Sequence, residues 1–268
     1  MLAVPRVTDG SEPFDGQHLT LLVIFVLGAV ALVVLGRAQR GPAASRPART
    51  TGRVLAVLVC CVTIPSQAFQ LTPGDFDLAT SLPLQLCDLA WVAAAWGLWT
   101  HRRLAVALTY YWGLTLTVQG IITPSLAEAF PHPRFFAFWG MHLLVVWSAL
   151  YLTLGLGLGP RWRDLRSSVV VTAVWAVLVY IVDVLLEVNY GYLVRKPQSS
   201  SALDLLGPWP VYLVVGAALL VGGWALMTWP WNRPQHPSSA RSGPRPAHRV
   251  AGCEVRTRSS RSARRRGR

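Results

Sequence analysis

A cysteine, a histidine and two aspartates have the residue types of a nucleophile, a base and an orienting acid. Cys87 stands in the segment LPLQLCD, where Pro83 favours the start of a helix and Asp88 follows the cysteine directly. The first turns of a helix favour thiolate over thiol, because unpaired backbone N–H groups stabilise negative charge there. An imidazole from His142, oriented by Asp183 or Asp88, would complete the set that covalent catalysis by a thiol requires.

Other polar residues in apolar segments have plainer interpretations. Gln67, Gln70 and Gln119 are typical of hydrogen bonds between membrane helices. Cys60 and Cys61 are typical of small apolar fillers. The four cysteines include no CxxC pair, and no His/Cys cluster has metal-ligand spacing. We therefore expect no metal, no cofactor and no disulfide framework.

The composition indicates a membrane protein. Of the 268 residues, 53% are hydrophobic and 14% are charged, whereas about 25% are charged in a typical soluble domain. The net charge of +13 does not indicate a nucleic-acid partner, because eleven arginines fall in residues 233–268. That tail is otherwise rich in Ser, Pro, Ala and Gly, so we expect disorder there. It either forms a solvated cytoplasmic end that fixes topology or contacts anionic lipid headgroups.

Seven apolar runs are long enough to span a bilayer, which takes about 20 residues each. They cover 18–36, 53–70, 82–99, 104–122, 134–158, 167–186 and 208–229. We predict an all-α polytopic fold with one transmembrane domain over 18–230. An extracytoplasmic leader over 1–17 would precede it, and the Arg-rich tail over 231–268 would follow. The leader is acidic rather than basic, so we expect no cleavable signal peptide.

The distribution of basic residues predicts the orientation of the chain. Leaving out the tail, ten arginines fall in the first, third and fifth loops, and four basic residues fall on the opposite side. Since Lys and Arg are enriched in cytoplasmic loops, the N-terminus is expected outside and the C-terminus in the cytoplasm.

This orientation predicts a shared depth for the polar residues of several spans. At 1.5 Å per residue, the outer half receives Gln85, Cys87, Asp88, Gln119, His142 and Asp183. Ionisable groups inside a membrane are costly and usually face a partner or a water-filled cavity. We therefore expect one polar cavity in the outer half of the helices.

Four segments resemble the YwaF-like family of bacterial integral membrane proteins. They are 82–87 (LPLQLC), 130–133 (FPHP, ahead of His142), 191–197 (GYLVRKP) and 201–210 (SALDLLGPWP). The resemblance covers roughly residues 15–230 and leaves out the tail. The family is similar to an animal relative, transmembrane protein 164, an acyltransferase that forms polyunsaturated ether phospholipids. The resemblance thus implies a lipid acyltransferase of the bacterial plasma membrane.

The resemblance also implies roles for individual residues. The nucleophile of the animal relative matches Cys87, and His142 matches the histidine of the fifth span and would be the base. The family often has a histidine two residues before the cysteine, where this chain has Gln85. The predicted catalytic set is Cys87, His142, Asp183 and Asp88, and the predicted substrate-binding set is Gln85, Gln119, Asn189, Tyr192, Lys196 and Trp209.

Phospholipids or lysophospholipids are the expected partners of this site. The segment 189–210 would cap the cavity, with its aromatic residues as interfacial anchors. Lys196 would meet a lipid phosphate there or extend toward the interface. Two other functions use the same residues: a lipid or ester hydrolase with water as acceptor, and a non-enzymatic carrier or lipid-binding protein. Acidic residues on the sixth span, with His142, would relay protons in a carrier.

Overall fold

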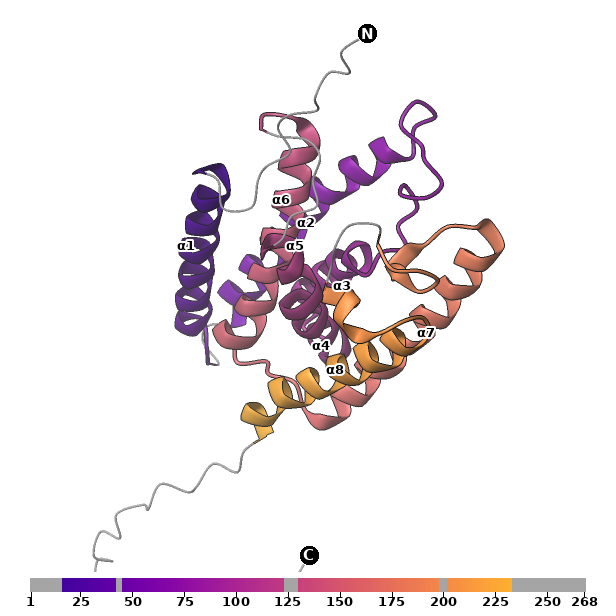
Figure 1. Ribbon diagram of the computed structural model, residues 1–268. Helices are drawn as coiled ribbons and strands as arrows, with labels where there is room; N and C mark the ends of the chain where they lie inside the picture. The colour runs from indigo at the N-terminus through magenta and orange to yellow at the C-terminus, as the bar shows by residue number, and fades with distance from the viewer. Residues whose placement is uncertain (1–15, 42–44, 123–129, 198–201, 233–268) are drawn as a thin grey trace, which may run out of the picture. The chain divides into compact units, whose positions relative to one another are not determined.

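The computed structural model describes residues 16–41, 45–122, 130–197 and 202–232 (Figure 1). The helices are α1 (Gly16–Ala38), α2 (Ser45–Gln70), α3 (Leu86–Thr100), α4 (Arg103–Trp112), α5 (Val118–Ile122), α6 (Pro133–Leu150), α7 (Trp162–Leu186) and α8 (Val211–Thr228). Two π-helical turns, η2 (Gly113–Thr117) and η3 (Tyr151–Gly155), continue α4 and α6. Three short 3₁₀ helices are η4 (Tyr190–Tyr192), η5 (Ala202–Leu206) and η6 (Trp229–Asn232). The described part of the chain contains no strand, so the all-α prediction is confirmed.

Six of the described helical stretches are long and apolar enough to cross a membrane. They are α1, α2, Arg103–Ile122, Pro133–Gly155, α7 and Val211–Asn232. The third predicted span differs, because α3 has only 15 residues and a length of about 22 Å. The predicted leader and tail, 1–17 and 231–268, lie outside the described residues except at their edges.

The predicted start of the third span at residue 82 is wrong. Helix α3 begins at Leu86, and the carboxylate of Asp88 accepts a hydrogen bond from the backbone N–H of Gln85 at 3.1 Å. Such a bond gives a partner to one of the backbone N–H groups that a helix start leaves unpaired. The position of the accepting carboxylate, in the third residue of the helix, therefore sets where the helix begins. Pro83 lies in the non-helical approach to this start.

Other helix bounds also differ from the apolar runs. Helix α2 begins at Ser45 and α7 at Trp162, ahead of the predicted 53 and 167. At α7 the reason is local, because Asp164 accepts a hydrogen bond from the backbone N–H of Arg161 at 2.8 Å. Helix α8 begins at Val211, after the predicted 208, because prolines occupy positions 208 and 210. Polar capping residues therefore move helix ends that hydrophobicity alone cannot place.

Helix α1 packs along α6 and η3 through small residues. A Cβ added at Gly36 would lie 2.6 Å from the Cα of Gly155, so the two backbones nearly touch there. Further along, the indole of Trp147 donates to the carbonyl of Phe25 at 2.9 Å. After α1, Arg40 donates to the carbonyl of Gly155 at 2.6 Å. Small residues permit such close approach between membrane helices, and the order of the contacts makes α1 and α6 parallel.

A cluster of buried aromatic side chains joins α4 to α7 and α8, and α7 and α8 lie side by side (Figure 1). The ring of Tyr111 stacks on Trp224 with centroids 4.9 Å apart, and its hydroxyl pairs with Thr228 at 2.6 Å. The indole of Trp112 donates to the hydroxyl of Thr172 on α7 at 3.0 Å. The polar tips of these aromatic residues therefore have partners on a neighbouring helix, as buried polar groups require.

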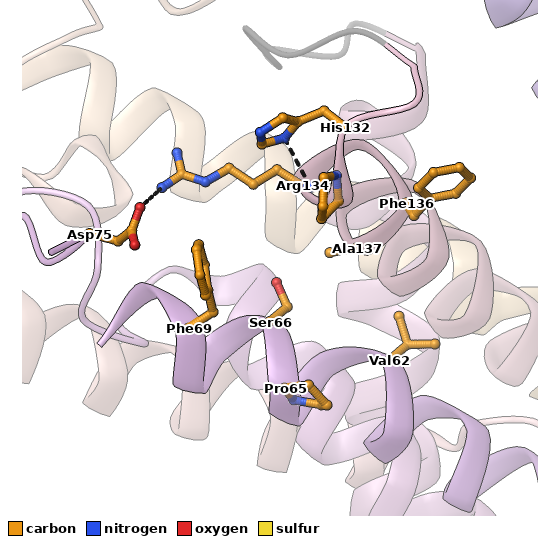
Figure 2. Close-up of a pocket in the computed structure, with 10 residues that line it drawn as sticks. Val62, Pro65, Ser66, Phe69, Asp75, His132, Arg134, Phe136 and Ala137 are labelled. Atoms are coloured by element: carbon orange, nitrogen blue, oxygen red, sulfur yellow. Dashed lines mark hydrogen bonds and ion pairs between the residues drawn. The ribbon is translucent and has the colours of Figure 1, made fainter. Parts of the chain in front are cut away.

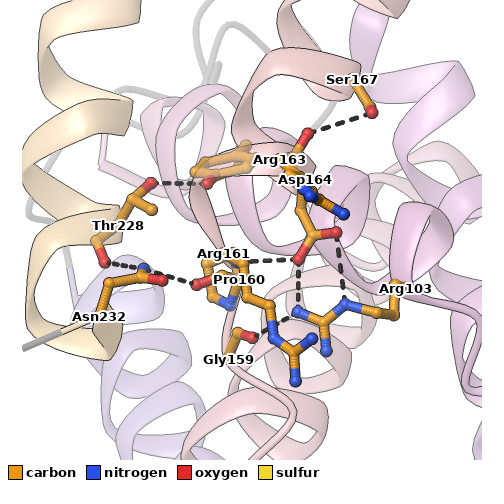
Figure 3. Close-up of polar contacts among 10 residues, drawn as sticks. Arg103, Gly159, Pro160, Arg161, Arg163, Asp164, Ser167, Thr228 and Asn232 are labelled. Atoms are coloured by element: carbon orange, nitrogen blue, oxygen red, sulfur yellow. Dashed lines mark hydrogen bonds and ion pairs between the residues drawn. The ribbon is translucent and has the colours of Figure 1, made fainter. Parts of the chain in front are cut away.

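An ion pair joins the start of α4 to the start of α7 at one end of the helices (Figure 3). Arg103 binds both carboxylate oxygens of Asp164 and also donates to the carbonyl of Gly159 at 3.3 Å. Asn232, after α8, donates to the carbonyl of Pro160 at 3.2 Å. Nearby, burial and the guanidinium of Arg49 lower the pKa of His101, which keeps this imidazole neutral. Polar contacts therefore hold this end together without using the predicted catalytic residues.

Candidate functional site

Cys87 is the second residue of α3, and its side chain is half-buried. This position lies within the first turn, where backbone N–H groups have no helical partners. The next residue, Asp88, is half-buried and is held by its bond to the backbone of Gln85. Asp88 thus fixes the start of the helix on which the cysteine stands.

The imidazole of His142 is buried in α6 and is oriented by its own helix. Its Nδ1 lies 2.7 Å from the carbonyl oxygen of Phe138, and the phenyl ring of Phe138 lies with its centroid 4.1 Å from the imidazole. Because a carbonyl only accepts, Nδ1 carries the proton. The neutral ring therefore has its lone pair on Nε2, which makes Nε2 the atom that can take up a proton.

Gly120 of α5 lies directly against this Nε2. A Cβ added at Gly120 would stand 2.6 Å from Nε2 and 2.7 Å from the adjacent ring carbon. Real Cβ atoms essentially never come this close to another heavy atom, so position 120 must lack a side chain for the ring to sit where it does. The sequence did not single out this glycine, although it immediately follows Gln119 in the predicted polar layer.

Asp183 is buried near the end of α7 and binds the segment that follows that helix. Its Oδ1 accepts a hydrogen bond from the backbone N–H of Tyr190 at 2.8 Å, and its Oδ2 has no hydrogen-bond partner among the described residues. Among the residues that the structure describes, no hydrogen bond or ion pair joins the side chains of Cys87, His142, Asp88 and Asp183 to one another. Their joint action stays a prediction.

The segment that follows α7 is hydrogen-bonded to the segment that precedes α3; we call this contact the closure. The hydroxyl of Tyr190 accepts a hydrogen bond from the N–H of Leu82 at 3.0 Å and donates to the carbonyl of Leu78 at 2.8 Å. The N–H of Gly191 donates to the side-chain oxygen of Gln85 at 3.1 Å. Burial raises the pKa of Tyr190, so its hydroxyl stays protonated and continues to donate. Gln85, a predicted substrate-binding residue, therefore holds this closure.

Asn189 organises the turn that follows α7. Its side-chain oxygen accepts from the N–H groups of Val194 and Arg195 at 3.3 and 3.1 Å, and its amide donates to the carbonyl of Arg195 at 2.9 Å. The indole of Trp209 donates to the carbonyl of Leu193 at 3.2 Å. The polar groups of these two predicted substrate-binding residues are thus engaged with the backbone of the segment.

The remaining predicted substrate-binding residues lie at exposed or partly exposed positions. Lys196 lies 3.8 Å from the carboxylate of Asp204, and its ammonium group stands 5.6 Å from the ring centroid of Tyr212. The side chains of Tyr192 and of Gln119 on α5 are exposed. Exposed aromatic and cationic side chains beside α8 suit the interface between lipid and water.

Replacing Tyr190 with phenylalanine is expected to loosen the closure over α3. The substitution removes an acceptor and leaves the partly buried N–H of Leu82 unpaired, which costs about 1–3 kcal/mol. Thermal unfolding of the purified chain in detergent should show a lower melting temperature. Tyr180→Phe is the matched control, because that tyrosine is exposed on α7. Equal melting temperatures for the two variants would contradict the role of the Tyr190 hydroxyl.

A cavity of about 760 Å³ lies between α2 and α6 (Figure 2). Its lining comes from the second half of α2, from Asp75 after that helix, and from the start of α6, where it includes His132, Pro133, Arg134, Phe136 and Ala137. Among the described residues that line it there is no member of the two predicted site sets. This cavity was not predicted from the sequence; Pro65 inside an apolar run and the segment 130–134 (FPHPR) are the features that could have indicated it.

The comparisons with known proteins give one match. The model of the TMEM164 family matches residues 13–228, which include all eight α-helices described above. No curated protein and no solved structure matches the chain.

Proposed function

This chain is a membrane protein of the TMEM164 family, and from that membership we propose that it is a thiol-dependent phospholipid acyltransferase. The observation that carries the proposal is the contact between Nδ1 of buried His142 and the carbonyl of Phe138, which leaves the lone pair of the ring on Nε2. A base of this kind and a cysteine in the first turn of a helix are two of the parts that acyl transfer through a thiol needs. The resemblance of residues 82–87 to the acyltransferase segment adds the reaction class.

The finer assignment belongs to the same proposal. We place the chain with YwaF-like proteins of the bacterial plasma membrane, with α3 as a seventh span and the N-terminus outside. Helices α3 and α4 are separated only by His101 and Arg102. Counting α3 as a span therefore keeps the direction of successive spans alternating, which favours this topology. The uneven distribution of arginines between the two sides favours the orientation.

In the first half of the reaction, the Cys87 sulfur attacks the carbonyl carbon of a phospholipid ester. His142 Nε2 accepts the thiol proton as the carbon–sulfur bond forms. The carbon–oxygen ester bond then breaks, and the imidazolium returns that proton to the departing oxygen. A lysophospholipid leaves, and the acyl chain remains on Cys87 as a thioester.

In the second half, the hydroxyl of an acceptor lysophospholipid attacks the thioester carbonyl. His142 Nε2 takes the hydroxyl proton, the carbon–sulfur bond breaks, and the proton passes to the departing thiolate. The products are a new phospholipid and free Cys87, so no other co-reactant is consumed. This sequence requires substrate binding to bring the sulfur of Cys87 and Nε2 within hydrogen-bonding reach, and such contacts commonly tighten only in the complex.

Capture of the thioester tests the proposal. The purified chain is mixed with phosphatidylcholine that carries an alkyne-labelled acyl chain, and peptides are analysed by mass spectrometry before and after hydroxylamine. The label should sit on Cys87 and disappear with hydroxylamine. His142→Ala and Gly120→Ala should each slow labelling by about 10²-fold or more, because one removes the base and the other displaces its ring.

Gly222→Ala is the control, because an added Cβ there meets nothing within 4 Å. The mechanism would be contradicted if Cys87 stayed unlabelled, or if the His142→Ala variant were labelled as fast as the unmodified protein. Addition of a lysophospholipid should convert the label to a diacyl product. Release of free fatty acid alone, with or without lysophospholipid, would make the protein a hydrolase.

A further inference from the structure

The cavity between α2 and α6 has an apolar wall and a polar rim. Val62, Pro65 and Phe69 of α2 line it together with Phe136 and Ala137 of α6 (Figure 2). The side chains of Phe69 and Phe136 are both more than half exposed, at 51% and 54%. Exposed phenyl rings on two helices that are long and apolar enough to span a membrane mark a wall that faces lipid.

The rim carries a cation at the start of α6. The guanidinium of Arg134 extends across the mouth toward Asp75, as Figure 2 shows, with a nitrogen–oxygen distance of 3.6 Å. This distance exceeds that of a hydrogen bond, and the two side chains are 40% and 36% exposed. Because the side chain of Arg134 is this exposed, an incoming anion can reach the guanidinium.

His132 adds a second donor at the same rim. Its Nδ1 accepts a hydrogen bond from the backbone N–H of Arg134 at 3.2 Å. The neutral ring therefore carries its proton on Nε2, which becomes a donor. The start of an α-helix of 18 residues adds the positive end of a helix dipole beside these two side chains. Three separate features thus favour a negatively charged group at the rim.

We propose that this cavity binds one phospholipid molecule, with its phosphate at Arg134 and His132 and an acyl chain along Val62, Phe69 and Phe136. A volume of about 760 Å³, apolar walls and a few convergent polar groups are typical of ligand sites. The apolar wall distinguishes a lipid from free phosphate, which would need polar groups on every side. The site is separate from the Cys87 site, so it does not depend on acyl transfer.

Photo-crosslinking in detergent micelles tests this site. The purified full-length chain is mixed with phosphatidylcholine that carries a diazirine on one acyl chain, illuminated and digested. Crosslinks should concentrate in peptides from 62–69 and 133–137. Arg134→Gln should lower them at least about tenfold, the loss expected when a charge-assisted hydrogen bond is removed. Ala137→Trp, which fills the cavity and leaves the rim intact, should lower them by a similar factor.

Arg166→Gln is the matched control, because it removes one positive charge from an exposed position of α7. Size-exclusion chromatography identifies variants that fail to fold, and Arg134→Lys, a milder change, should retain part of the crosslinking. Unlabelled phosphatidylcholine should compete, whereas inorganic phosphate should not. Crosslinks spread evenly over the helices, equal crosslinking of Arg134→Gln and Arg166→Gln, or displacement by inorganic phosphate would each overturn the proposal.

Discussion

Replacing Cys87 with alanine is expected to abolish acyl transfer between phospholipids. The proposed reaction stores the acyl chain on the sulfur, and the carboxylate of Asp88 in the same turn is held by the backbone N–H of Gln85. Loss of a nucleophile commonly lowers the turnover number by about 10³-fold or more. The rate is measured as the transfer of a radiolabelled acyl chain from phosphatidylcholine to a lysophospholipid in mixed micelles.

The chain supplies matched controls for this experiment. Cys60 and Cys61 stand in α2, so Cys60→Ala and Cys61→Ala remove a thiol without touching the first turn of α3. Both variants should transfer acyl chains at the rate of the unmodified protein. Cys87→Ser tests the nucleophile separately from the size of the side chain, because serine has a similar volume but a much weaker nucleophile. Full activity of Cys87→Ala would exclude the thioester and, with it, the proposed mechanism.

Replacing Gly36 with valine is expected to detach α1 from α6. The first added carbon would meet the backbone of Gly155 at 2.6 and 2.9 Å, and neither backbone can move aside as a flexible side chain would. Overpacking of this kind costs about 1–3 kcal/mol. For a chain of this size we expect the melting temperature in detergent to fall by about 5–10 °C.

Gly222→Val is the matched control for this substitution. Gly222 lies in α8, and a Cβ added there meets nothing within 4 Å. The same change of residue type should therefore leave the melting temperature almost unchanged or raise it slightly, because glycine is a poor helix former. If the Gly36→Val and Gly222→Val variants had the same melting temperature, the close contact between α1 and η3 would not contribute to stability.

Much of the fold could be predicted from the distribution of apolar residues. Helices occupy all seven apolar runs, and six of the described stretches have the length and hydropathy of spans. The errors lie at helix ends, where a single carboxylate such as Asp88 or Asp164 decides the first residue. Hydrophobicity does not register such a bond, because it depends on one side chain reaching one backbone group.

The surroundings of the candidate site were harder to predict. The sequence suggested a carboxylate as the partner of His142, but the partner of Nδ1 is a carbonyl of the same helix, four residues earlier. Any buried histidine on a helix has such a carbonyl within reach, so residue types at a common depth do not fix the pairing. The cavity between α2 and α6 depends on which side chains of the two helices face each other, and that is a property of packing.

The shortness of α3 has a consequence for the membrane itself. In a seven-span arrangement, a helix of about 22 Å falls about 8 Å short of a hydrocarbon core of roughly 30 Å. In that arrangement the non-helical backbone that precedes α3 would lie at the depth of the missing 8 Å, and the hydroxyl of Tyr190 binds it at two points. Irregular backbone is tolerated at such depth only where protein or water surrounds it. The surface of the bilayer would therefore dip at Cys87, and a lipid ester could meet the thiol without leaving its own leaflet.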